Sequence, residues 1–169
     1  LFLWLAMLGS VVALRRGEHM RMTAIVGMLA PRARAFLDLV AVAAALAFLA
    51  LVLHPAIEFA QDEAFVTTPA LEIANSWRAA ALPIGIALMI LIGLIQLLRF
   101  GRLRDVALAI AAVALVIGLT VLVGPHLKGL GNWNLLIFFV GGVGAMVLLG
   151  VPIAFSFGLA TFAYLALTT

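Results

Sequence analysis

The sequence predicts an all-α integral membrane protein, with antiparallel transmembrane helices and a short amphipathic helix at the cytoplasmic interface. Two observations predict this class. Hydrophobic residues make up 67% of the chain and charged residues only 10%, whereas soluble domains are nearer half apolar and a quarter charged. In addition, apolar runs long enough to cross a bilayer alternate with clusters of basic residues.

The basic residues predict how the chain is oriented in the membrane. Most of them lie in two clusters: Arg15, Arg16, Arg21, Arg32 and Arg34, then Arg99, Arg102 and Arg104. The segment between the clusters carries the acidic residues Glu58, Asp62, Glu63 and Glu72. Because Lys and Arg are retained on the cytoplasmic side of short loops, both clusters are expected inside and the acidic segment outside. The positive charge therefore indicates orientation and lipid-headgroup contact, and no nucleic-acid partner is expected.

The chain begins in an apolar run, residues 1–14, which is predicted to be the end of a span that leaves the membrane at Arg15 and Arg16. This run is shorter than the roughly 20 residues that a span needs, so we expect the chain to be an internal fragment of a longer protein. Residues 18–30 follow, with apolar positions on one helical face: Met22, Ile25, Val26 and Leu29. This pattern favours a short helix in the cytoplasmic interface over a polar loop.

The next span is predicted over residues 35–53, after Pro31. Since a proline can kink a helix without ending it, we expect this helix to continue past Pro55 toward Phe65. Thr68 and Pro69 resemble a helix start, with the threonine as N-cap and the proline at the first helical position.

The alternation of apolar runs and charged segments predicts two further spans. Residues 79–98 contain no charge and form the clearest span of the chain, and Trp77 marks its outer interface. Residues 105–123 supply another span that returns the chain to the outside. Residues 124–129, which include a Gly-Pro pair, are predicted to be the outer loop.

The last part of the chain is apolar and too long for one span. A continuous helix over residues 134–168 would measure roughly 50 Å, more than the bilayer core, so a break is expected. The candidates are the glycine-rich residues 141–144 and the Gly-Val-Pro at 150–152. Proline removes a hydrogen-bond donor and clashes with the preceding turn, whereas small residues also permit close helix packing. Interrupted spans of this kind are typical of secondary transporters; one broken span and a hairpin both remain open.

The residues that usually carry catalysis or hold metals are sparse. The chain has no cysteine, and His19, His54 and His126 lie in separate segments without a metal-ligand spacing. No catalytic, substrate-binding or metal-binding residue is therefore assigned. The few polar residues within the spans are expected to form interhelical hydrogen bonds: Gln96, Thr120, Ser156 and Thr161.

Three short motifs resemble the membrane subunits of TRAP transporters (tripartite ATP-independent periplasmic transporters). Residues 14–22 resemble a region of the small subunit where a span ends at Arg-Gly-Glu-His, here through Arg16, Gly17 and His19. Residues 77–85 are similar to the last span of that subunit, through Trp77, Pro83 and Gly85. Residues 148–155 look like the opening helix of the large subunit, through Gly150 and Pro152.

The order of these motifs implies a fused polypeptide. Residues 1–101 resemble the small (Q-type) subunit without its first span, and residues 133–169 resemble the start of the large (M-type) subunit. Residues 102–132 would then be a fusion helix and outer loop. Such a helix is needed because the small subunit ends inside and the large one begins outside, in agreement with the charge map.

The resemblance implies a membrane component of a sodium-coupled secondary transporter that imports organic acids. Its expected partners are a periplasmic solute-binding protein, the rest of the large subunit and the phospholipid bilayer, and its expected location is the bacterial cytoplasmic (inner) membrane, with several spans. The fragment would act as a scaffold, or brace, and as the joint between subunits. No cofactor is expected in it, and Na⁺ is expected to bind in the missing part of the large subunit. Which organic acid is carried, C4-dicarboxylate, sialic acid or another, stays open.

The alternative is a polytopic membrane scaffold without transport activity, or the anchor subunit of a membrane enzyme complex. An anchor of a respiratory or proton-moving complex would have paired histidines at haem spacing or a carboxylate at mid-membrane, and the sequence has neither. We therefore expect no enzyme activity. For Arg16 the choice between lipid or subunit contact and simple cytoplasmic retention is open, as it is for His19.

Overall fold

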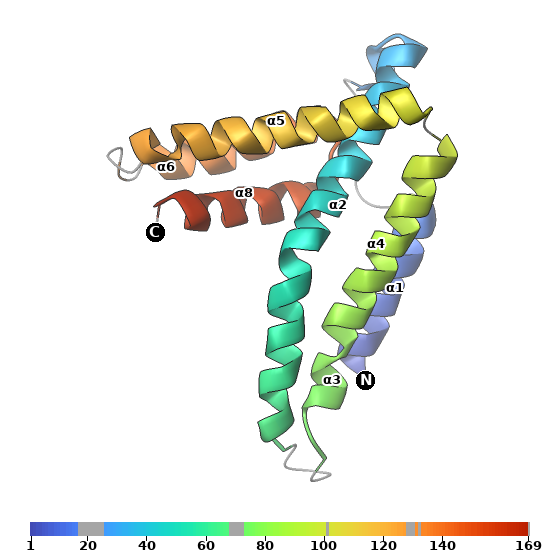
Figure 1. The fold of residues 1–169 in the computed structure, drawn as a ribbon, viewed down its shortest axis with the longest axis vertical. Coiled ribbons are helices and arrows are strands. Elements are labelled where there is room, and N and C mark those ends of the chain that lie inside the picture. The colour runs from blue at the N-terminus through green and yellow to red at the C-terminus, as the bar shows by residue number, and fades with distance from the viewer. Residues whose placement is uncertain (17–25, 68–72, 101, 128–130, 132, 169) are drawn as a thin grey trace. The chain divides into compact units, whose positions relative to one another are not determined.

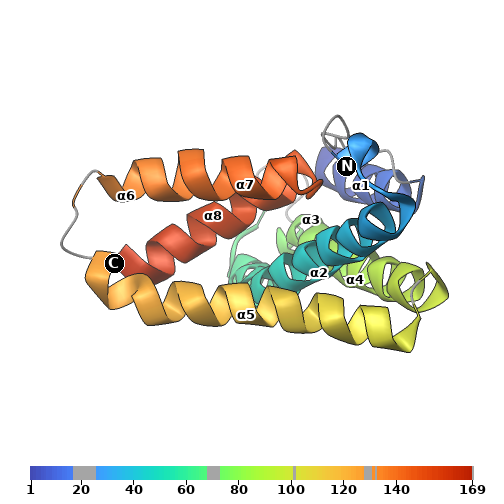
Figure 2. The same ribbon diagram turned by 90° about the horizontal axis from the view of Figure 1, so that it is seen from above.

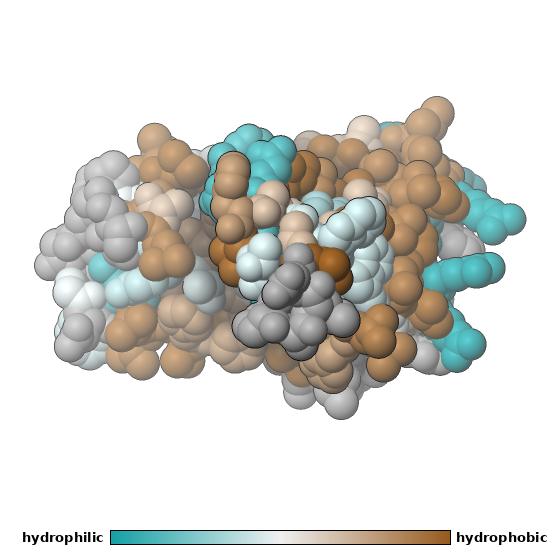
Figure 3. Space-filling model, turned by 90° about the horizontal axis from the view of Figure 1, so that it is seen from below, coloured by the Kyte–Doolittle hydropathy of each residue, from teal (hydrophilic) through white to brown (hydrophobic). Residues whose placement is uncertain are grey.

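The computed structural model describes residues 1–16, 26–67, 73–100, 102–127, 131 and 133–168. Within these ranges the regular elements are helices (Figure 1), apart from one isolated bridge between Thr67 and Ala74. Hydrophobic residues cover most of the face drawn in Figure 3, and hydrophilic residues are confined to a few groups. The predicted all-α membrane class is confirmed.

Among the described residues, three helical stretches are long and apolar enough to cross a membrane: Pro31–Phe65, Ser76–Arg99 and Leu103–Gly124. They correspond to the three complete spans that the sequence predicts. The helices that build them are α2 (Pro31–Asp62) with the 3₁₀ turn η2 (Glu63–Phe65), α3 (Ser76–Ala79) with α4 (Ala81–Phe100), and α5 (Leu103–Leu127).

Helix α2 confirms that Pro55 does not end the predicted span. The helix runs for 32 residues with Pro55 inside it, which at ~1.5 Å per residue is about 48 Å. That length exceeds the roughly 30 Å hydrocarbon core of a bilayer. Helix α2 therefore extends past the core, and its acidic end continues through η2 to Phe65.

The outer loop predicted at residues 124–129 was wrong for its first four residues, because α5 continues to Leu127. Gly124 lies in the helix at a packing contact: a Cβ atom there would be 2.6 Å from Leu167 Cδ2 of α8 (Ile153–Thr168). The backbone angle of proline is close to that of a helix, so the Gly-Pro pair is compatible with a last helical turn.

The chain divides into two compact units. The first consists of Leu1–His19 and Leu49–Gln96, and it contains α1 (Phe2–Arg16), the second part of α2, η2, α3 and most of α4. The second consists of Met20–Phe48 and Leu97–Thr169. It contains the short 3₁₀ turn η1 (Val26–Met28), the first part of α2 and all helices from α5 onward.

The core of the second unit joins the first part of α2 to the start of α5. Leu39 packs with Leu97, Val106 and Ala109 in a buried cluster. Further side chains from α2 cover this cluster: Phe36, Val40, Val42 and Leu46. The starts of α2 and α5, which carry the last arginines of the two basic clusters, therefore lie together.

The last part of the chain is a helical hairpin. Its first arm is continuous through α6 (Trp133–Leu135), the π-helix η4 (Leu136–Gly142) and α7 (Val143–Leu148), and its second arm is α8. The arms lie side by side (Figure 2), with Phe138 and Phe139 each 6.0 Å from Tyr164 between ring centroids. The structure thus selects the hairpin over a single broken span.

The glycines at 141–144 do not break the first arm, and that candidate break was wrong. Gly141 and Gly142 belong to η4, and α7 follows without interruption. The wider turns of a π-helix keep the backbone hydrogen-bonded, so the small residues leave no gap in the helix. The break falls at the other candidate, residues 150–152.

Two predicted features fall on residues that the structure does not describe. Of the helix expected at residues 18–30, the described part comprises η1 and the two residues after it. The helix start predicted at Thr68 and Pro69 lies outside the described residues, and the next described helix begins at Ser76.

Candidate functional site

Helix α1 packs along α3 and α4 in the first unit, and the motif residues Trp77 of α3 and Gly85 of α4 lie in this pairing. The indole Nε1 of Trp4 donates a hydrogen bond of 2.9 Å to the carbonyl oxygen of Trp77. Farther along, a Cβ atom on Gly85 would lie 2.8 Å from Met7 Cβ and 2.6 Å from Met7 Cε. The glycine is therefore required for the close approach of the two helices, as small residues are at helix interfaces in membranes.

At the other end of this pairing, Gln96 bonds to the last turn of α1. Its amide nitrogen lies 3.1 Å from the Leu14 carbonyl oxygen and 3.5 Å from that of Arg15. The last carbonyls of a helix have no partner within the helix, and the Gln96 amide satisfies them here. The contact confirms the prediction that Gln96 forms an interhelical hydrogen bond.

The order of these contacts shows that α1 and α4 are parallel. Trp4, Met7 and Leu14 of α1 meet Trp77, Gly85 and Gln96 in the same sequence order. Both helices therefore finish at the same end of the unit, where α1 ends on Arg15 and Arg16 and α4 carries Arg99 in its last turn. Such an arrangement is what the predicted orientation requires.

The other three polar residues predicted to bond between helices bond within their own helix instead. Thr120 Oγ1 donates to the Val116 carbonyl at 2.7 Å, and Thr161 Oγ1 donates to the Phe157 carbonyl at 2.8 Å. Ser156, fully buried, donates to the Pro152 carbonyl at 3.2 Å. A hydroxyl can reach the carbonyl one turn back without a second helix, which is why the sequence pattern was misread.

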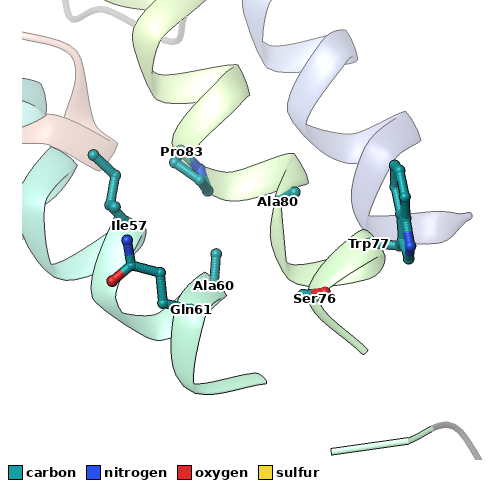
Figure 4. Close-up of a pocket in the computed structure, with 7 residues that line it drawn as sticks. All are labelled: Ile57, Ala60, Gln61, Ser76, Trp77, Ala80 and Pro83. Atoms are coloured by element: carbon teal, nitrogen blue, oxygen red, sulfur yellow. The ribbon is translucent and has the colours of Figure 1, made fainter. Parts of the chain in front are cut away.

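Pro83 lines an open, mostly apolar cavity of about 320 Å³ at the end of α2 (Figure 4). The cavity lies between α2 and the α3–α4 segment, and its walls are Ile57, Ala60, Gln61, Ser76, Trp77, Ala80 and Pro83. Three of these side chains, Gln61, Ser76 and Trp77, carry an uncharged polar group, and none is ionisable. The cavity therefore offers no charge to an anionic substrate.

Asn75 connects the two ends of the outer acidic segment by hydrogen bonds. This residue is buried (6% exposed), and its side-chain amide donates a hydrogen bond to the carboxylate of Glu63. Its backbone N–H also donates to the Val66 carbonyl oxygen at 2.7 Å. Hydrogen bonds to a charged acceptor are the stronger kind, so Asn75 joins η2 to the start of α3.

The residues near the Asn75–Glu63 hydrogen bond are exposed and include both apolar and charged side chains. Phe65 is 92% exposed, and Val66 and Ile73 are about half exposed. On the preceding turns of α2, His54 Nδ1 lies 3.5 Å from Glu58 Oε1, and both side chains are mostly exposed. The end of α2 thus presents acidic and apolar groups side by side.

The Gly-Val-Pro motif forms the tip of the hairpin. Gly150 has a φ of +88°, a conformation that side chains disfavour. A Cβ atom on Gly150 would lie 3.2 Å from Val26 Cγ2 of η1. Val151 and Pro152 are buried, and the Pro152 carbonyl accepts hydrogen bonds from the Phe155 and Ser156 amides. Gly150 and Pro152 therefore shape a tight, buried turn.

Helix α8 also approaches α2 closely in the second unit. A Cβ atom on Gly158 would lie 2.5 Å from Phe48 Cζ. The Phe48 ring also contacts that of Phe155, with 6.0 Å between centroids in an edge-to-face geometry. Sequence reasoning assigned no role to Phe48 or Gly158, because the contact joins residues more than a hundred positions apart.

The remaining family-motif residues are at the end of α1. Arg16 is the last residue of that helix and is exposed. Gly17 and His19 lie outside the described residues, so their predicted roles stay predictions. Within the described ranges, His, Asp and Glu residues form no group of three that could hold a metal ion.

A comparison with protein-family models identifies a match over residues 1–103 to the model described as "Tripartite ATP-independent periplasmic transporters, DctQ component". The matched region contains α1 to α4 and ends at the first residue of α5. A comparison with curated proteins gave no match.

Proposed function

Because the chain belongs to the family of the DctQ component of tripartite ATP-independent periplasmic transporters, we propose that it serves a sodium-coupled importer of organic acids. That it is a membrane component of a tripartite ATP-independent periplasmic transporter follows from the family. Sodium coupling and the organic-acid substrate are our proposal, as is a position in the bacterial cytoplasmic membrane with the basic clusters facing the cytoplasm. The particular acid is left open.

We assign the chain the role of a scaffold, or brace. The observation that carries this role is the use of its polar groups. Gln96 bonds to backbone carbonyls of α1, and the hydroxyls of Thr120, Ser156 and Thr161 bond to carbonyls of their own helix or its start. These side chains support helices and leave no donor to bind a carboxylate, so the substrate and Na⁺ sites belong in the rest of the large subunit.

The proposed joint between subunits is α5 with the outer loop that follows it, and the hairpin after it is the proposed start of the large subunit. The family match ends at residue 103, and α5 begins there. Helix α5 has an apolar stretch of 22 residues, Leu103–Gly124, which is enough to carry the chain from one side of the bilayer to the other. This supports a fusion of a small subunit with the start of a large one.

We propose that the outer acidic segment contributes to docking of a periplasmic solute-binding protein. The segment offers exposed carboxylates beside exposed Phe65, Val66 and Ile73. Charged residues at the edge of an interface steer association, and aromatic and aliphatic residues provide buried contact area. The Asn75–Glu63 bond fixes the base of this surface, so a partner would not have to order it on binding.

The proposal is tested by uptake of labelled organic acids into proteoliposomes that contain the full-length protein. Uptake should require both an inward sodium gradient and the cognate solute-binding protein. Uptake that proceeds without sodium, or equally fast without the binding protein, would contradict the assignment. A panel of C4-dicarboxylates, sialic acid and other carboxylates then identifies the substrate.

A further inference from the structure

Five exposed arginines surround one packing junction of the second unit. In this junction, the buried cluster around Leu39 joins the first part of α2 to the end of α4 and the start of α5, and Figures 1 and 2 show these three segments together. Each arginine precedes or follows a residue of the cluster by no more than about two helical turns. We call the set the arginine patch: Arg32, Arg34, Arg99, Arg102 and Arg104.

The charge of the arginine patch is not neutralised by its neighbours. All five side chains are exposed, and within the described ranges none of them forms an ion pair with another described residue. Two carboxylates lie near the same helix starts: Asp38, which is exposed, and Asp105, which is half-buried. Five arginines therefore outweigh two carboxylates. The starts of α2 and α5 add the positive ends of two helix dipoles, against one negative end from α4.

Apolar side chains border the arginines on the surface. Leu98, next to Arg99 in the sequence, is 65% exposed, and Leu103, between two arginines of the patch, is 82% exposed. A soluble anion would gain nothing from these leucines, whereas a phospholipid brings a phosphate and acyl chains to the same place. Exposed leucines beside exposed arginines at the ends of membrane spans therefore favour a lipid as the ligand.

The arginine patch contains no lysine, although a signal for orientation would work with either residue. A guanidinium group can pair with two oxygens of one phosphate, which the ammonium group of lysine cannot do. The arginines also form two groups, one on α2 and one around the connection from α4 to α5. Packed helices lie about 8–10 Å apart between axes, so each group can hold one phosphate of the same lipid.

We propose that the arginine patch binds an anionic phospholipid that carries two phosphate groups. Arg32 and Arg34 hold one phosphate, and the arginines around the α4–α5 connection hold the other. Basic pockets between membrane helices bind cardiolipin, a lipid of this class. The bound lipid links α2 to α4 and α5 at the point where the family match ends. This goes beyond the scaffold role proposed above, and it depends on neither sodium coupling nor the transported substrate.

Binding is measured by native mass spectrometry of the full-length protein, purified in detergent and titrated with cardiolipin or with phosphatidylglycerol, which carries one phosphate. The wild type should bind cardiolipin more tightly at equal phosphate concentration. Arg34→Gln combined with Arg102→Gln should raise the Kd for cardiolipin about 25-fold, since each basic residue near an anionic surface contributes roughly a factor of five. Arg78→Gln, at an exposed arginine outside the patch, is the matched control and should leave this Kd unchanged.

Two further variants separate phosphate recognition from charge and from folding. Arg34→Lys combined with Arg102→Lys keeps the charge but removes the planar donors, so the Kd for cardiolipin should still rise severalfold. Arg32→Gln combined with Arg99→Gln again removes one arginine from each group and should match the first glutamine pair. Because the substituted side chains are exposed, the unfolding temperature without added lipid should equal that of the wild type.

Four outcomes would overturn the proposal: equal affinity for cardiolipin and phosphatidylglycerol, wild-type binding by both glutamine pairs, an equal loss of binding with Arg78→Gln, or wild-type binding by the lysine pair. Binding in detergent requires neither sodium nor a solute-binding protein. A failed uptake assay therefore leaves these results unchanged, and the two proposals fail separately.

Discussion

The amide of Gln96 donates a hydrogen bond of 3.1 Å to the carbonyl oxygen of Leu14, which lies 82 positions earlier in the chain. The bond joins α4 to the last turn of α1, one residue before the basic pair Arg15 and Arg16. It holds the ends of two parallel helices at one level, and so places the first basic pair beside the end of α4.

We expect Gln96→Leu to weaken the first unit, because the carbonyls at the end of α1 would lose their donor. Hydrogen bonds between membrane helices contribute about 0.6 kcal/mol on average, and a buried group left without a partner costs more, about 1–3 kcal/mol. A loss within this range should appear in denaturant unfolding of the protein in detergent micelles. Ile95→Leu, on an exposed position of the same helix, is the control and should leave the free energy of unfolding unchanged.

Gly85→Ala should destabilise the pairing of α1 and α4. The new Cβ atom would meet Met7 Cβ at 2.8 Å, and this neighbour cannot rotate away. Overpacking of this kind costs about 1–3 kcal/mol. Gly118→Ala is the matched control, since nothing lies within 4 Å of that position in α5. It should be neutral or stabilise the helix by up to about 1 kcal/mol; equal effects of the two substitutions on thermal unfolding would refute the packing argument.

Gly150→Ala should cost about 1–2 kcal/mol, because the positive φ of +88° is disfavoured for a residue with a side chain. The contact with Val26 adds to this cost. Gly144→Ala, in the same arm with nothing within 4 Å, should be tolerated. Both variants are compared by the temperature at which the detergent-solubilised protein loses its helical circular dichroism. Equal transition temperatures would show that the tip does not need a left-handed residue.

The contact between Gly158 and Phe48 lends itself to a double-mutant cycle. Gly158→Ala should destabilise the second unit, since its Cβ atom would meet the edge of the Phe48 ring at 2.5 Å. Phe48→Leu should cost stability alone by leaving a cavity, but should relieve part of the clash in the double variant. Residues in contact show coupling energies of about 0.5–3 kcal/mol. A coupling of zero would mean that the two residues do not touch.

Asn75→Ala should loosen the outer acidic segment and lower uptake that depends on the solute-binding protein. The substitution removes the amide that bonds to Glu63, at a cost of about 1.5–3 kcal/mol for a bond to a charged group. The apparent Kd for the binding protein should rise. Ser76→Ala, at the neighbouring position, should leave this Kd unchanged. An unaltered Kd for Asn75→Ala would show that the Asn75–Glu63 bond does not contribute to docking.

Much of the first unit could be predicted from sequence, and its contacts could not. Trp77, Pro83 and Gly85 stand out as a motif, and their span is observed as α3 and α4. That Gly85 serves an approach to Met7 is not visible in the motif, because any of several helices could have been its neighbour. Trp4 and Asn75 carry no pattern at all, and their partners are set by how the chain folds back.

In the second unit, the sequence predicted one of the two candidate helix breaks correctly and the other wrongly. The Gly-Val-Pro break was predictable because proline and a left-handed glycine act on the local backbone. The glycines at 141–144 misled the prediction, since whether small residues break a helix or widen it into η4 depends on what packs against them.

The number of apolar runs, their lengths and the sidedness implied by the arginines are properties of the linear sequence, because burial in lipid and charge retention act on each segment separately. Tertiary structure alone decided that α1 and α4 are packing partners, that residues 133–168 form a hairpin, and that Val26 meets its tip. Those outcomes depend on close contacts between distant residues, where a single Cβ atom changes which helices can meet.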